Sequence, residues 1–175
     1  MPDVFTHLMI GASLALILRP RGTRAEQMLI ILGSVIIDIE RPVSWILGGT
    51  GFYWIGLSSA FHSLLGAVVL SYFAATCFNL EAITTRNKSA LVLIGGLSHL
   101  VMDMTMYPWA EHGLYILYPL KVPFSFHLLW PDFWFYPLIG ATCFVSAVLI
   151  NRLMLTRLSP RSGKAFEDGA PPPVV

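Results

Sequence analysis

Residues 95–108 read GGLSHLVMDMTMYP and close an apolar run that begins at residue 89. As a helix, 89–107 would extend roughly 28 Å, which is long enough to cross the hydrocarbon core of a bilayer. The run nevertheless contains His99 and Asp103, and an acid at that depth costs about 2.5–3.5 kcal/mol on insertion scales. Because the two residues are four positions apart, both side chains lie on one helix face and can share a metal ion or a polar partner.

The composition indicates a membrane protein. Of the 175 residues, 55% are hydrophobic and 12% are charged, whereas a soluble domain has about 25% charged residues. The net charge is only +1, and no basic stripe with interleaved aromatics occurs, so nucleic acid is not an expected partner. Cys77 and Cys143 both lie inside apolar runs, which indicates small core or lipid-facing side chains and not a disulfide framework.

Five apolar segments predict an all-α, integral membrane helical bundle that forms a single domain over residues 1–158. The segments cover residues 4–18, 27–39, 60–80, 89–107 and 133–155. The last three have spanning length, while the first two are marginal. The tail 159–175 is polar and proline-rich, and it is predicted to be disordered.

The distribution of lysine and arginine predicts the topology. Successive connections and the tail carry 3, 1, 2, 1 and 4 basic residues, with none before the first segment. The protein is predicted to be integral to the cell or inner membrane. Since basic residues favour the cytoplasmic side, its N-terminus is predicted to lie outside and its C-terminus in the cytoplasm. All five histidines, and the acids most deeply embedded in apolar sequence, then fall at the outer face. His112 and His127 are interpreted as solvated loop residues outside the site.

The remaining outer-face residues combine imidazoles with carboxylates and include no thiolate. Such a nitrogen and oxygen ligand set suits zinc, and also iron, manganese or nickel. Zinc with an open coordination position lowers the pKa of bound water and polarises an ester or phosphoryl oxygen. Glu40 is the candidate general base, and Arg41 or Lys121 is the candidate partner for an anionic substrate group.

Four short motifs also point to a family. They read FTHL at 5–8, GSVIIDIE at 33–40, FHSL at 61–64 and GLSH at 96–99. In order and spacing these motifs resemble the YdjM-like family of membrane-bound metal-dependent hydrolases. The resemblance covers roughly residues 2–130. That family is similar, more remotely, to zinc phospholipases C and single-strand zinc nucleases, which implies phosphoester hydrolysis. The resemblance implies five metal ligands, namely His7, Asp38, His62, His99 and Asp103.

Three features depart from the family pattern. Ile37 stands where the family has a proline before its first aspartate, and Glu40 stands in place of the second aspartate. An arginine-bearing histidine element is not evident around 58–61. These departures leave open whether the site takes one or two metal ions and whether this member is catalytically altered.

Two other classes of function fit the same residues. A transporter, or a protein that conducts protons or metal ions, would use the His/Asp set as a relay. A structural protein would use it as a hydrogen-bonded contact between helices. The relay requires polar residues in the inner halves of the segments, and few are present. The preferred prediction is therefore a membrane-bound, zinc-type hydrolase that acts on an ester or phosphoester at the outer face, with a membrane lipid as a candidate substrate.

Overall fold

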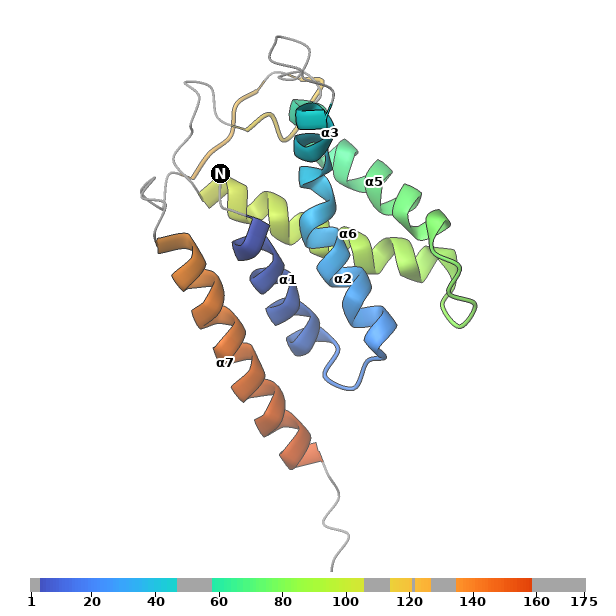
Figure 1. Ribbon diagram of the computed structural model, residues 1–175, viewed down its shortest axis with the longest axis vertical. Helices are drawn as coiled ribbons and strands as arrows, with labels where there is room; N and C mark the ends of the chain where they lie inside the picture. Colours follow the sequence, from blue (N-terminus) through green and yellow to red (C-terminus); the bar gives the residue numbers. More distant parts are fainter. Residues whose placement is uncertain (1–3, 47–57, 106–113, 121, 127–134, 159–175) are drawn as a thin grey trace, which may run out of the picture.

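The computed structural model describes residues 4–46, 58–105, 114–120, 122–126 and 135–158, and the regular elements named in these ranges are helices (Figure 1). The elements are α1 (Val4–Leu18), α2 (Arg24–Ile36), the short 3-10 helix η1 (Ile37–Ile39), α3 (Glu40–Ile46), α5 (Leu64–Cys77), α6 (Thr85–Thr105) and α7 (Phe135–Leu158). The predicted all-α class is confirmed. The predicted tail 159–175, together with Lys121, His112 and His127, lies outside the described residues.

The third apolar segment is shorter as a helix than its sequence predicts. The sequence predicts an apolar segment of spanning length over 60–80, but α5 has only 14 residues and ends at Cys77. It begins at Leu64 because the Ser63 side chain caps its first turn by accepting a hydrogen bond from the Gly66 amide at 3.0 Å. The prediction of spanning length is therefore wrong for this segment. Among the described helices, α7 is long and apolar enough over Phe135–Arg157 to cross a membrane, and α1 and α5 are shorter apolar helices.

Across the bundle the helices lie in the order α7, α1, α2, α6 and α5. α2 packs mainly on α6, α1 lies between α2 and α7, and α5 packs on α6 (Figure 1). The α2–α6 contact brings backbone against backbone, because a Cβ on Gly33 would collide with the Val92 carbonyl and a Cβ on Gly95 with the Ile30 carbonyl. The buried side chains beside this contact are Ala15, Leu29, Ile30, Ala74, Leu91 and Val92.

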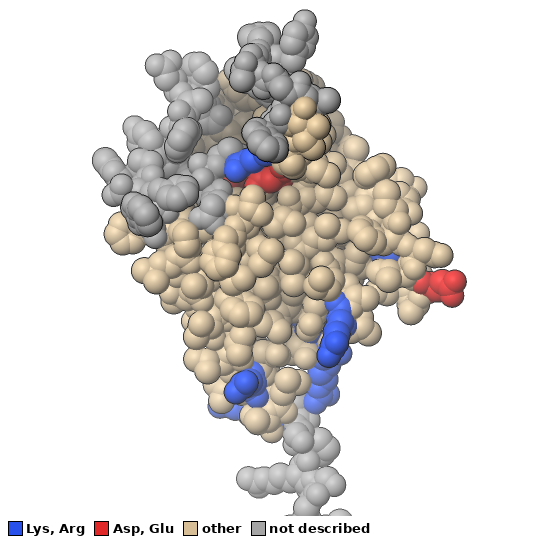
Figure 2. All heavy atoms as spheres, viewed as in Figure 1, with Lys and Arg blue, Asp and Glu red and all other residues tan. Residues whose placement is uncertain are grey.

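The outer surface of the bundle is apolar over its middle. Large hydrophobic side chains are exposed along α5 and α7, among them Leu65, Val69, Tyr72, Phe73, Leu138, Val145, Leu149 and Leu153. In Figure 2 most of the visible Lys and Arg gather at the lower end of the molecule, where Figure 1 shows the α1–α2 connection. An apolar band bounded by a basic end is the pattern expected of helices that face lipid.

Candidate metal centre

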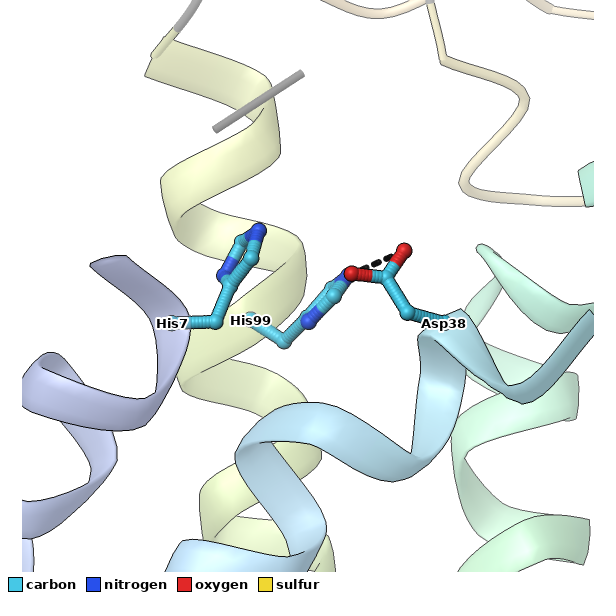
Figure 3. Close-up of side chains that lie close together, drawn as sticks. All are labelled: His7, Asp38 and His99. Carbon is cyan, nitrogen blue, oxygen red and sulfur yellow. Dashed lines mark ion pairs between the residues drawn. The ribbon is translucent and has the colours of Figure 1, made fainter. Parts of the chain in front are cut away.

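The structure brings all five predicted ligands together at the end of the bundle opposite the α1–α2 connection. Four different parts of the chain supply them: α1, η1, the turn before α5, and α6 (Figure 3 shows three of these side chains). All five residues are at most 7% exposed. They are His7, Asp38, His62, His99 and Asp103, and the buried Glu40 adjoins them.

Local structure aims each side chain at the same point. His99 and Asp103 stand one turn apart on α6, with His99 Nε2 at 3.3 Å from Asp103 Oδ2. At the end of α2 the chain tightens into η1, which turns Asp38 into the cluster. His62 lies in the turn that precedes the Ser63 cap, so the start of α5 at Leu64, and not at residue 60, leaves His62 outside this helix.

Main-chain carbonyls orient two of the imidazoles. His99 Nδ1 lies 2.8 Å from the Ser34 carbonyl oxygen, and His62 Nδ1 lies 3.0 Å from the Ser58 carbonyl oxygen. A carbonyl only accepts, so both Nδ1 atoms donate, and in the neutral form of each ring the lone pair of Nε2 points into the cluster. Metal-binding histidines commonly have this arrangement of a second-shell carbonyl on the other ring nitrogen.

The two Nε2 atoms face two carboxylate oxygens in an alternating ring. His62 Nε2 lies 3.3 Å from Asp38 Oδ1 and 3.6 Å from Asp103 Oδ2. His99 Nε2 lies 3.9 Å from Asp38 Oδ1 and 3.3 Å from Asp103 Oδ2. Two ligands bound to one zinc at 2.0–2.2 Å with tetrahedral angles would be about 3.3–3.5 Å apart. Four of the six separations that a four-coordinate zinc shell requires are therefore 3.3–3.9 Å, which is close to that range.

Hydrogen bonds do not satisfy this cluster. Among the described residues, nine buried side-chain atoms of the six clustered residues have no hydrogen-bond partner, including Nε2 of all three histidines and both oxygens of Asp38 and of Asp103. Several of these atoms lie in the imidazole–carboxylate contacts given above, which are attractive where an imidazole is protonated. With neutral rings, each unsatisfied buried polar group costs about 1–3 kcal/mol. A divalent cation fits the donor set, because it would bind several of these atoms at once.

Glu40 and Arg41 border the ligand cluster. Glu40 Oε1 accepts a hydrogen bond from Ser58 Oγ at 3.0 Å and lies 3.7 Å from His62 Nδ1. Arg41 Nε lies 3.0 Å from Asp38 Oδ1, and its side chain is 37% exposed. Glu40 is therefore enclosed beside the cluster, while the Arg41 guanidinium extends from the cluster towards the surface.

Comparison with known families bears on the whole chain. The sequence model of a family described as YdjM inner membrane protein matches residues 1–162. The chain belongs to the YdjM family. The predicted family resemblance is thus confirmed, and YdjM membership identifies the chain as an inner membrane protein. No curated protein and no solved structure matches the chain.

Motif reading of this YdjM chain missed the groups that orient the ligands. The carbonyls of Ser34 and Ser58 carry no sequence signature of their own. The sequence did offer one signal, namely a glycine one turn from each of two candidate ligands: Gly95 before His99 and Gly11 after His7. In the structure a Cβ on Gly11 would collide with Ser34 Oγ. Glycines one turn from two candidate ligands indicate that the YdjM helices approach most closely just inward of the cluster.

Proposed function

We propose that this protein is a membrane-bound, metal-dependent hydrolase that cleaves an ester or phosphoester at the outer membrane face. The observation that carries the proposal is the way His62 and His99 face Asp38 and Asp103. With both Nδ1 atoms donating to carbonyls and both rings neutral, the Nε2 lone pairs and the carboxylate oxygens are acceptors that face one another at 3.3–3.9 Å. A cation between them turns this repulsion into coordination.

Different residues of the cluster would have different roles in hydrolysis. His62, His99, Asp38 and Asp103 would hold the cation, which is proposed to be zinc, and His7 lies beside them. When bound, such a cation supplies Lewis acidity and an activated water.

Two side chains act around that centre. Glu40 would act as the general base, which is supported because Ser58 holds one of its oxygens and the other has no hydrogen-bond partner within the described structure. Arg41 would hold an anionic oxygen of the substrate through its guanidinium group.

The surroundings of the cluster support an outer-face site and a lipid substrate. The basic end of the molecule lies opposite the cluster (Figure 2), and basic residues favour the cytoplasmic side. The proposed orientation therefore has the N-terminus outside and the C-terminus in the cytoplasm. A cluster near one membrane surface, on a bundle whose α5 and α7 expose apolar side chains, meets the headgroup region of membrane lipids.

A relay of protons or metal ions across the membrane is less well supported. Just inward of the cluster the α2–α6 interface consists of Ile30, Val92 and close-packed glycine backbone. The buried Ser71 hydroxyl farther along α5 donates to its own helix, to the Ala67 carbonyl, at 2.6 Å. These contacts favour a site that opens to one side only.

Metal analysis tests the proposal. The full chain is purified in detergent, its metal content is measured, and hydrolysis of bis(p-nitrophenyl) phosphate and of a neutral chromogenic ester is followed before and after treatment with a chelator. The double variant H99A/D103A should lose both metal and activity. Glu81→Ala removes an exposed carboxylate at the opposite end of α5 and should retain both. Equal metal content in the double variant and the wild type would refute the proposal.

A further inference from the structure

Asp103 presents its two oxygens to different histidines. Oδ2 lies 3.3 Å from His99 Nε2, and Oδ1 lies 3.4 Å from His7 Nε2. Each separation matches the distance of about 3.3–3.5 Å between two ligands of one zinc ion. The carboxylate therefore has two faces of equal geometry, although a single cation of the kind proposed above needs only the Oδ2 face.

The two imidazoles that meet this carboxylate are stacked. The rings of His7 and His99 lie 3.7 Å apart between centroids with 15° between their planes, and Figure 3 shows them side by side next to Asp38. Since both Nε2 atoms face the same carboxylate, their lone pairs run nearly parallel. Cations bound to them would be separated by roughly the ring spacing, and the metals of two-metal hydrolytic sites are about 3.5–4 Å apart.

Donor atoms remain after one cation has been accommodated. The first shell uses Nε2 of His62 and His99 with one oxygen each from Asp38 and Asp103. His7 Nε2, Asp103 Oδ1 and Asp38 Oδ2 are still without a hydrogen-bond partner among the described residues. Ligand atoms of His7, Asp38 and His99 also lie within 4.8 Å of one another, so Asp38 reaches the His7 side of the cluster.

We infer that the centre holds two divalent cations, with Asp103 as the bridging carboxylate and His7 as the ligand specific to the second cation. This inference rests on the proposed metal dependence and adds the number of ions and the division of ligands between them. Asp38 would contribute its second oxygen to the His7 side. Two-metal sites stabilise both the attacking and the leaving oxygen of a displacement, so the class of substrate best served is a phosphoester.

Metal stoichiometry and spin coupling test the inference without an activity assay. The purified full chain is stripped with a chelator and dialysed against Mn²⁺, and bound metal per chain is measured together with the electron paramagnetic resonance spectrum. The wild type should bind two Mn²⁺ and show an exchange-coupled multiline signal. His7→Ala should bind one Mn²⁺ with the uncoupled six-line signal, and the control Glu81→Ala should match the wild type.

The outcomes separate the second cation from the function itself. If the wild type binds one Mn²⁺ with an uncoupled signal, the two-cation inference is wrong while the hydrolase proposal stands. If His7→Ala still binds two coupled ions, His7 is not the ligand of the second cation and the inference is equally overturned. A wild type that binds no metal would overturn the proposed function as well. The wild-type spectrum decides between one and two cations even where His7→Ala does not fold.

Discussion

His99 Nδ1 and the Ser34 carbonyl oxygen, 65 positions apart in the sequence, lie 2.8 Å apart in the structure. This contact joins α6 to the last turn of α2, and it is buried. It is possible because Gly33 and Gly95 let the two backbones touch. The orientation of a candidate metal ligand thus depends on helix packing that lies one turn away from it.

Adding a methyl group at that packing point should damage the site from a distance. We expect Gly95→Ala to destabilise the protein by about 1–3 kcal/mol, because its Cβ meets the Ile30 carbonyl, and to weaken metal binding about 10- to 100-fold by displacing His99 from Ser34. Thermal unfolding in detergent and metal titration measure the two effects. Gly96→Ala is the matched control, since its Cβ would meet nothing nearer than Ile37 Cδ1 at 3.5 Å. Equal metal affinity in the two variants would contradict this account.

Removing the charge of Glu40 should separate catalysis from metal binding. Glu40→Gln keeps the shape of the side chain and an oxygen for Ser58 Oγ but removes the base. Hydrolysis should fall about 100- to 10,000-fold while metal content stays at the wild-type level. Turnover and metal per chain are measured on the same preparation, with Glu81→Gln as the control. A Glu40→Gln variant that loses its metal would make Glu40 a ligand instead of a base.

Arg41 should discriminate between charged and neutral substrates. Arg41→Ala removes a half-exposed guanidinium 3.0 Å from Asp38. KM for a phosphodiester should rise about tenfold, the loss expected for one charge-assisted hydrogen bond, while KM for a neutral ester stays near the wild-type value. Arg41→Lys should recover part of the difference because it restores charge without the planar fork. An equal rise in KM for both substrates would rule out recognition of the anionic group.

An existing cysteine reports the orientation in the membrane. Cys77 is exposed at the end of α5 opposite His62, and the proposed topology puts that end in the cytoplasm. A membrane-impermeant maleimide should therefore label the protein in inverted vesicles but not in intact spheroplasts. Cys77→Ser identifies any signal that comes from Cys143. Labelling of Cys77 in spheroplasts alone would reverse the orientation and place the candidate metal centre at the inner face.

Local sequence was sufficient for much of the fold. The apolar run 4–18 coincides with α1, and residues 89–105 of the apolar run 89–107 lie in α6. The helix begins at Thr85, before the apolar run, because Thr84 Oγ1 accepts a hydrogen bond from the Asn87 amide and so starts the helix within polar sequence. Hydrophobicity alone does not register such a cap.

The candidate site was predictable in its members but not in its construction. The family resemblance implied the five clustered residues, and each of them is a polar residue embedded in apolar sequence. The start of α5 after Ser63 was not predicted, because the sequence stays hydrophobic across this position and the helix start depends on the Ser63 hydroxyl alone. The carbonyl that contacts His99 Nδ1 could not be predicted for a different reason. It belongs to Ser34 on another helix, and only the packing of α2 on α6 brings the two residues together.

The short helices have a consequence for the lipid around the protein. α1 and α5 have 15 and 14 residues, so they extend only about 21–23 Å, against a hydrocarbon thickness of about 30 Å. Bilayers accommodate such hydrophobic mismatch by thinning locally. Thinning beside the N-terminal ends of α1 and α5, where His7 and His62 lie, would bring lipid headgroups closer to the membrane midplane. A lipid substrate could then contact the site while its chains stay in the bilayer.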